Sequence, residues 1–349
     1  MIRFSKPRYR KAGFHLALWA TALAAVVLLL GVYTRLNDAG LGCPDWPGCY
    51  GYMLWPSDAG EIAQAEKMYP QSAVEAGKAW LEMLHRYLAA ALGALVIALA
   101  IISWRRREVE DYPFRLPTLI LFLVVWQSFF GMWSVTLKLL PQVVTFHLLA
   151  GMITFALLWV LALRLGSRPW QIDVDAQRPL QGIRPWLVVL VIGLLLQIAL
   201  GGWTSSNYAA FACSDFPTCQ NEWWPEMDFK NGFDLMQTVG PNYLGGRLET
   251  EARVAIHVTH RLGGLVLAVL TFIIGGSLMR VKNNQVRLLT TTLLMLVGGE
   301  ILLGVANNLL MAPMLTALLH HLFSALILLV LATLVTGIWM ARPDYATQE

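Results

Sequence analysis

The chain has 349 residues, of which 57% are hydrophobic and 14% are charged, and its formal net charge is +4. Soluble globular domains carry about 25% charged residues. The composition therefore indicates a polytopic membrane protein and excludes a nucleic-acid-binding protein or a cytosolic α/β enzyme. Against this apolar background, the seven histidines and four cysteines are the first candidates for function.

Apolar runs divide the chain into eight predicted transmembrane helices, since a bilayer crossing takes about 20 such residues. The final run is too long for one helix, and Pro313 divides it because proline lacks a backbone N–H and disfavours helix before it. The predicted fold class is an all-α integral membrane protein. The runs cover residues 13–34, 87–104, 116–137, 139–163, 185–214, 254–279 and 288–341.

Most of the 26 basic residues fall in segments that would lie on one side of the membrane. These segments are the N-terminus, every second connection and the C-terminus. The positive-inside rule then places both termini in the cytoplasm, in a bacterial plasma (inner) membrane. Two long loops, roughly 37–79 and 207–252, are expected to face outward.

The two halves of the sequence are similar. At an offset of 170 residues, seven positions between Thr34 and Cys49 are identical to those between Thr204 and Cys219. We expect two tandem four-helix bundles in the same orientation, because four spans return the chain to its starting side. The predicted divisions are an N-terminal half (1–165), a cytoplasmic linker (166–185) and a C-terminal half (186–349). Further residue pairs match at offsets of 173 and 175: Gly131 with Gly304, His147 with His320, His85 with His260, and Arg86 with Arg261.

Each outer loop contains a pair of cysteines with five intervening residues, Cys43 and Cys49 in the first and Cys213 and Cys219 in the second. Disulfides persist in an oxidising compartment outside the cytoplasm. Each pair is either a structural staple of its loop or a redox-active pair, and the glycine-rich first loop is the better candidate for the redox role. A zinc site is not favoured, because the pairs lie in different halves without CxxC spacing.

Six histidines lie near the outer ends of the even-numbered helices. Ionisable residues inside a membrane are costly and usually functional. Two imidazoles that face each other across a four-helix bundle can ligate a haem iron, so we predict one bis-histidine haem site in each half. The offset of 173 favours His320 over its neighbour His321 as a ligand, and the role of His257 stays open. The predicted iron ligands are His85 and His147 in the first half, and His260 and His320 in the second.

A carboxylate distinguishes the halves. Glu82 precedes His85 by three residues, and the aligned position in the second half is His257. A carboxylate beside a haem can accept a proton or stabilise a developing cation, although a capping or interfacial role is also open. Arg86 and Arg261 follow the ligand histidines and are candidates for binding haem propionates.

Polar residues also interrupt two apolar helices at aligned positions. Glu300 and its counterpart Gln127 are each compatible with a proton path, a hydrogen bond to a haem edge or a helix–helix hydrogen bond.

The run Gly40-Leu-Gly-Cys-Pro-Asp-Trp-Pro-Gly-Cys49, followed by Glu82-Met-Leu-His85-Arg86, closely resembles the haem A synthase family of cytochrome oxidase assembly. The resemblance covers essentially the whole chain. It implies oxidation of the C8 methyl group of haem O to a formyl group, which gives haem A. It also implies that His85 and His147 hold haem O, with Glu82 and His85 catalytic, and that His260 and His320 hold a permanent haem b.

The expected partners are haem O, the membrane lipid, a haem O synthase and an electron-transfer partner, with homo-oligomerisation open. The alternative function is a di-haem b membrane cytochrome that transfers electrons without substrate chemistry. This alternative would explain the four ligand histidines but neither Glu82 nor the cysteine motif.

Overall fold

The computed structural model describes residues 10–166 and 169–344, and it confirms the predicted all-α membrane fold. Eight helices in this part of the chain are long and apolar enough to cross a membrane. Pro313 separates the last two, as predicted, and Met311 and Ala312 before it have positive φ angles of 58° and 51°. The eight helices are α1 (Phe14–Leu36), α3 (Ala76–Arg105), α4 (Arg115–Thr136), α5 (Pro141–Gly166), α6 (Val174–Ser206), α8 (Thr250–Met279), α9 (Asn284–Leu309) and α10 (Met314–Met340).

Short elements occupy the connections. In the first outer loop, α2 (Ala59–Met68) begins at Asp58, whose side chain accepts hydrogen bonds from the backbone N–H groups of Gly60 and Glu61. The second outer loop contains the 3₁₀ helix η1 (Ala209–Phe211) and the single turn α7 (Phe229–Gly232). Near the opposite end, β1 (Gln171–Asp173) pairs in parallel with β2 (Arg342–Asp344).

Two helices begin about three turns before their apolar runs. α3 begins at Ala76 rather than at residue 87, so its first turns contain the charged residues Lys78, Glu82 and Arg86. These side chains have local partners that a hydropathy pattern does not reveal. α6 begins at Val174 and therefore extends into the segment expected to be a linker. It also ends at Ser206, before the predicted limit at residue 214, because the chain turns there into η1.

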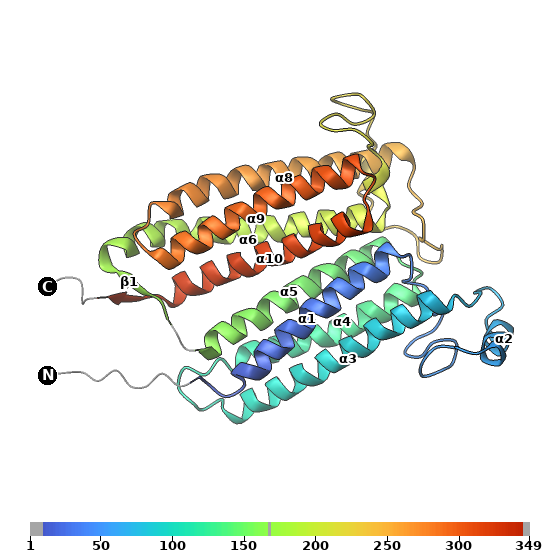
Figure 1. Ribbon diagram of the computed structural model, residues 1–349, viewed down its shortest axis with the longest axis horizontal. Helices are drawn as coiled ribbons and strands as arrows, with labels where there is room; N and C mark the ends of the chain where they lie inside the picture. Colours follow the sequence, from blue (N-terminus) through green and yellow to red (C-terminus); the bar gives the residue numbers. More distant parts are fainter. Residues whose placement is uncertain (1–9, 167–168, 345–349) are drawn as a thin grey trace.

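Each half forms a ring of four helices. α1 contacts α3 and α5, and α4 closes the first ring between them; α6, α8, α9 and α10 form the second ring in the same manner. The halves meet where α1 and α5 pack against α6 and α10 (Figure 1). Figure 1 also shows that both long loops lie at one end of the molecule, opposite the start of α1 and the end of α10. That the two units are parallel copies of each other stays a prediction.

Candidate functional site

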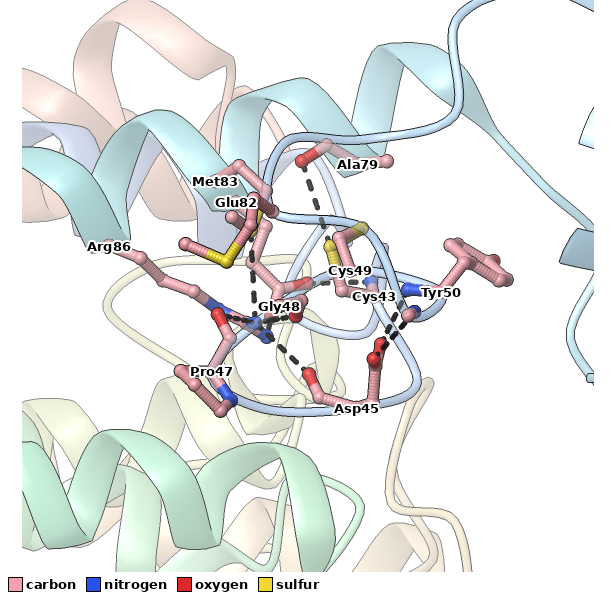
Figure 2. Close-up of a disulfide and its surroundings, with 12 residues drawn as sticks. Cys43, Asp45, Pro47, Gly48, Cys49, Tyr50, Ala79, Glu82, Met83 and Arg86 are labelled. Carbon is pink, nitrogen blue, oxygen red and sulfur yellow. Dashed lines mark hydrogen bonds and ion pairs between the residues drawn. A yellow bond between two sulfur atoms is a disulfide. The ribbon is translucent and has the colours of Figure 1, made fainter. Parts of the chain in front are cut away.

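Both cysteine pairs form disulfides, Cys43–Cys49 and Cys213–Cys219, as the sequence predicted. Each pair closes a short loop at the end of its bundle where the two long loops lie, and Figure 2 shows the first. In each loop, two backbone hydrogen bonds join the second cysteine to the residue three positions further along the chain. The N–O distances are 2.9 and 3.0 Å for Cys49 with Tyr52, and 3.0 and 3.1 Å for Cys219 with Glu222.

An aspartate organises each disulfide loop from within. Asp45 accepts backbone hydrogen bonds from Tyr50 (2.5 Å) and Gly51 (2.8 Å). Asp215, at the aligned position, accepts them from Gln220 (2.7 Å) and Asn221 (3.1 Å). A hydrogen bond from the Thr218 hydroxyl, together with these backbone amides, holds the pKa of Asp215 below its ordinary value.

The two arginines expected at haem propionates contact these loops. Arg86 Nη1 donates to the carbonyl oxygens of Asp45 (3.0 Å), Pro47 (3.2 Å) and Gly48. Arg261 donates to the carbonyl oxygens of Asp215 (3.0 Å) and Thr218 (2.8 Å), which align with Asp45 and Gly48 at an offset of 170. The guanidinium groups therefore hold each loop against its helix, a role that the sequence did not predict. Propionate binding by these arginines stays a prediction.

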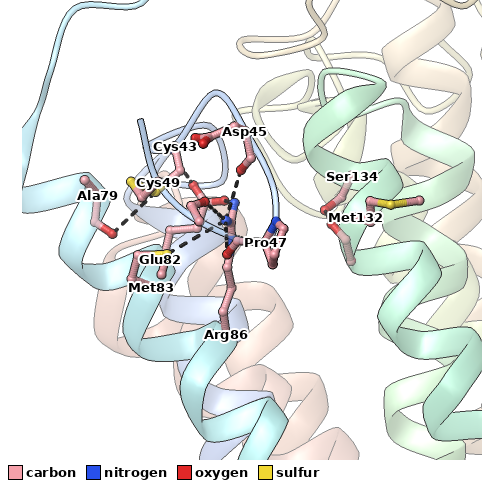
Figure 3. A network of polar contacts seen from close by, with 12 residues as sticks. Cys43, Asp45, Pro47, Cys49, Ala79, Glu82, Met83, Arg86, Met132 and Ser134 are labelled. Carbon is pink, nitrogen blue, oxygen red and sulfur yellow. Dashed lines mark hydrogen bonds and ion pairs between the residues drawn. A yellow bond between two sulfur atoms is a disulfide. The ribbon is translucent and has the colours of Figure 1, made fainter. Parts of the chain in front are cut away.

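Glu82 lies under the first loop and is almost completely buried, with 5% of its surface exposed. Its Oε2 accepts a hydrogen bond of 2.9 Å from the backbone N–H of Cys43. Its Oε1 forms an ion pair with Arg86, one turn further along α3. Figure 3 shows this network beside the outer end of α4, where Met132 and Ser134 lie across from Pro47. The carboxylate is thus fixed between α3 and the disulfide loop.

In the second half, the arginine that holds the disulfide loop has a different side-chain partner. His257 occupies the position that aligns with Glu82, and it is also buried. Arg261 instead donates to Asn308 Oδ1, and Asn308 Nδ2 donates to the Asp215 carbonyl at 2.8 Å. Sequence reasoning missed Asn308, although a buried asparagine near the end of an apolar helix is a signal of a polar contact.

A glycine on a neighbouring helix lies against each of the four predicted iron ligands. A Cβ built on the glycine would stand 3.0–3.5 Å from the imidazole Cε1 atom in every case. The glycines therefore leave room for the rings. The corresponding contacts of His147 and His320 favour His320 over His321 as the equivalent ligand. The pairs are Gly31 with His85, Gly131 with His147, Gly201 with His260 and Gly304 with His320.

A cavity of about 750 Å³ lies within the C-terminal ring and borders His257, His260, His320 and His321. Its volume is in the range of about 300–1,000 Å³ that is typical of ligand and cofactor sites. The ring centroids of His260 and His320 are 6.4 Å apart. An iron atom bound by two imidazole nitrogens at about 2 Å each would separate the centroids by roughly 6 Å. The residues present therefore fit a bis-histidine haem.

Polar side chains lie beside the Nδ1 atoms of this pair. Gln197 Nε2 lies 3.1 Å from His260 Nδ1, and Glu300 Oε1 lies 3.4 Å from His320 Nδ1. Ligating histidines commonly bind such partners through the nitrogen that does not face the metal. Glu300 accepts a hydrogen bond from Ser324, which joins α9 to α10. Gln197 was not among the predicted site residues, although it interrupts an apolar run.

In the N-terminal half, His85 and His147 come from α3 and α5, which lie across the ring from each other. Within the described residues, their Nδ1 atoms are buried without a hydrogen-bond partner, as is Oε1 of Gln127. Unpaired polar atoms inside an apolar bundle are costly unless a ligand or water satisfies them. The donor set of this half also fits a haem, here with Glu82 three residues from one ligand.

Comparison with known proteins gives a consistent result. Residues 14–332 match the model of a family described as "Cytochrome oxidase assembly protein". A protein of Shewanella oneidensis named "Heme A synthase" is 40% identical to this chain, over 90% of this chain and 93% of its own length. A protein of the same name from Beijerinckia indica is 27% identical over 89% of each chain. The chain therefore belongs to the cytochrome oxidase assembly protein family.

Proposed function

We propose that this protein is an oxidoreductase that converts haem O to haem A by oxidising the C8 methyl group to a formyl group. The observation that carries the proposal is the buried Glu82 carboxylate, fixed between a disulfide loop and Arg86 beside the predicted ligand His85. The similarity to proteins named heme A synthase over most of the chain supports the same reaction.

The substrate is held by the N-terminal half in this proposal, with the imidazoles of His85 and His147 on either side of its iron. His260 and His320 hold haem b, which supplies one-electron transfer when it is bound. The C-terminal cavity and the polar partners of His260 and His320 support a permanent cofactor there. The chain itself binds, orients and encloses both the substrate haem and haem b.

Glu82 acts as the proton acceptor during oxidation of the methyl group. Residues three apart on a helix share a face, so Glu82 and His85 are presented to the same side of α3. The Cys43 N–H and Arg86 each stabilise the charged carboxylate through a charge-assisted hydrogen bond. A carboxylate held in this manner can accept a proton or stabilise positive charge that develops on the substrate.

The proposed membrane location, orientation and partners of the protein follow from the same reaction and from the distribution of its basic residues. It is placed in the bacterial inner membrane with both termini in the cytoplasm, so that both disulfide loops lie on the oxidising side. A haem O synthase delivers the substrate and an electron-transfer partner accepts the electrons. The Cys43–Cys49 disulfide holds the loop that binds Glu82, which gives this disulfide a structural role in the site.

The experiment is the replacement of Glu82 by Gln, followed by extraction and mass spectrometry of the haems bound to the purified protein. A general base contributes typically 10²–10⁴-fold to a rate, so haem A formation should fall at least about 100-fold while haem O or a hydroxylated intermediate accumulates. Glu75→Gln is the matched control, because Glu75 immediately precedes α3 but is exposed and forms its ion pair with Lys78. Normal haem A formation by Glu82→Gln would remove Glu82 from the mechanism.

A further inference from the structure

A second cavity, of about 310 Å³, lies between the two halves of the molecule. Its walls come from α1 and α5 of the first half and α10 of the second. Nearly all the lining side chains are aliphatic or aromatic, among them Leu18, Ala25, Phe155 and Leu326. The cavity thus lies between the two rings rather than inside either of them.

Three lining residues carry polar groups, and two of them are satisfied. Thr21 Oγ1 donates to the carbonyl of Ala17 at 2.7 Å, and Trp159 Nε1 donates to Thr333 Oγ1 at 2.8 Å. The third is His321, whose ring forms no hydrogen bond with any described residue of the chain. The cavity is therefore apolar apart from one imidazole, which lacks a hydrogen-bond partner among the described residues.

His321 connects this cavity to the larger one. It borders both cavities, together with Leu148 and Met152. Its ring centroid is 6.5 Å from that of His320, the predicted iron ligand. A ligand that contacts His321 from the smaller cavity therefore lies next to the redox site of the C-terminal half.

We propose that this cavity binds a lipid-soluble quinone, with a ring carbonyl accepting a hydrogen bond from His321 and the isoprenoid chain lying along α1 and α5. A lipid acyl chain would fill the space but leave the imidazole unpaired, which is unfavourable in an apolar surrounding. A single water molecule needs two to four polar partners, and this wall offers one. A quinone provides both the apolar body and the acceptor.

The proposal rests on the proposed function and supplies its electron acceptor. In the first oxidation, the methyl group and one water molecule become a hydroxymethyl group, and two electrons and two protons convert one quinone to a quinol. In the second, the hydroxymethyl group becomes a formyl group while a second quinone is reduced in the same way. Quinones reach the cavity through the bilayer, so no soluble carrier is required.

The test uses the purified full-length protein and decylubiquinone, with binding measured by isothermal titration calorimetry. Replacing His321 by Leu removes the hydrogen bond and should weaken binding about 10-fold. His321→Gln keeps a donor and should restore most of the affinity. Ala25→Phe fills the cavity and should abolish binding, whereas Ala90→Phe, on the exposed face of α3, should not change it. Thermal unfolding of each variant shows whether it has kept its fold.

Equal decylubiquinone affinity in wild type, His321→Leu and Ala25→Phe would overturn the proposal. An Ala25→Phe variant that raises the KM for haem O without changing quinone affinity would also overturn it, because the cavity would then hold the farnesyl chain of the substrate. Glu82→Gln should bind decylubiquinone as wild type does. If quinone binding behaves as expected but no haem A forms in wild type, the proposed function fails and the quinone site stands.

Discussion

The two disulfide loops share one framework of hydrogen bonds from an aspartate and an arginine, but they differ in the side chain that binds the arginine. In both, an aspartate binds the backbone amides five and six residues ahead, and an arginine from the next long helix holds two corresponding carbonyls. In the first loop, the arginine also pairs with the Glu82 carboxylate. In the second, it binds the neutral amide of Asn308. The shared hydrogen bonds therefore stabilise the loop in both halves. Only the first half adds a buried carboxylate, that of Glu82, as a partner of the arginine.

A similar difference separates the predicted iron ligands. Gln197 and Glu300 lie beside the Nδ1 atoms of His260 and His320. The residues aligned with them in the first half are Val27 and Gln127. Partners of this kind fix the orientation of a ligating ring. Under the proposed function, these partners suit the second half to retaining its haem, and valine at one of the two positions suits the first half to a haem that enters and leaves.

The largest expected difference between the loops comes from replacing each arginine by Gln. Arg86→Gln leaves a buried carboxylate without its cation, and breaking a buried ion pair costs about 3–5 kcal/mol. Arg261→Gln removes only hydrogen bonds to neutral groups and should cost less, about 1.5–3 kcal/mol. Thermal unfolding of both variants in the same detergent measures the difference. Equal losses of stability would show that the Glu82–Arg86 pair adds nothing to the shared framework.

Exchanging the partners of the ligand histidines should have the next largest effect. Gln197→Val gives the second site the residue of the first, and loss of such a partner typically lowers metal affinity 10–100-fold. The variant should therefore lose haem b during purification, as measured by the haem-to-protein ratio. Val27→Gln is the reciprocal change and should slow release of haem from the first half. If Gln197→Val retains its full haem content, the polar partner does not explain retention.

Close approach of the first loop to α3 depends on Gly42. A Cβ at this position would lie 2.6–2.8 Å from backbone atoms of Lys78 and Ala79. Gly42→Ala must therefore displace the loop and lengthen the bond from Cys43 N–H to Glu82. We expect a loss of about 1–3 kcal/mol in stability and slower haem A formation. The second loop already has Ala212 at the aligned position, so Ala212→Gly is the control and should cost no more than about 1 kcal/mol. A fully active Gly42→Ala protein would show that this contact is dispensable.

Hydropathy and spacing predicted the eight spans and the cysteine pairs because these depend on residues close together in the sequence. The contacts of Arg86 were not predictable from its position next to His85. Successive residues on a helix point about 100° apart, so the arginine faces the loop when the histidine faces the bundle. Asn308 was missed for a different reason, since its partner Asp215 lies in a distant loop. The cavity beside His321 depends on how the two halves pack, which no local pattern specifies.

The smallest expected effect concerns the hydroxyl of Thr218, which has no counterpart at the aligned position of the first loop. Thr218 donates to Asp215, whereas the aligned residue in the first loop is Gly48. This bond is the largest cause of the lowered pKa of Asp215, so Thr218→Val should raise that pKa. A carboxyl group with a lowered pKa stabilises the fold above its unfolded pKa of about 3.9, and this stabilisation is lost as the pH falls through the folded pKa. The acid-induced loosening of residues 213–222, followed by hydrogen exchange between about pH 2 and pH 5, should therefore begin at a higher pH in the variant. The first loop is the internal reference, and an equal shift there would mean that the substitution acts on the whole outer face rather than on Asp215.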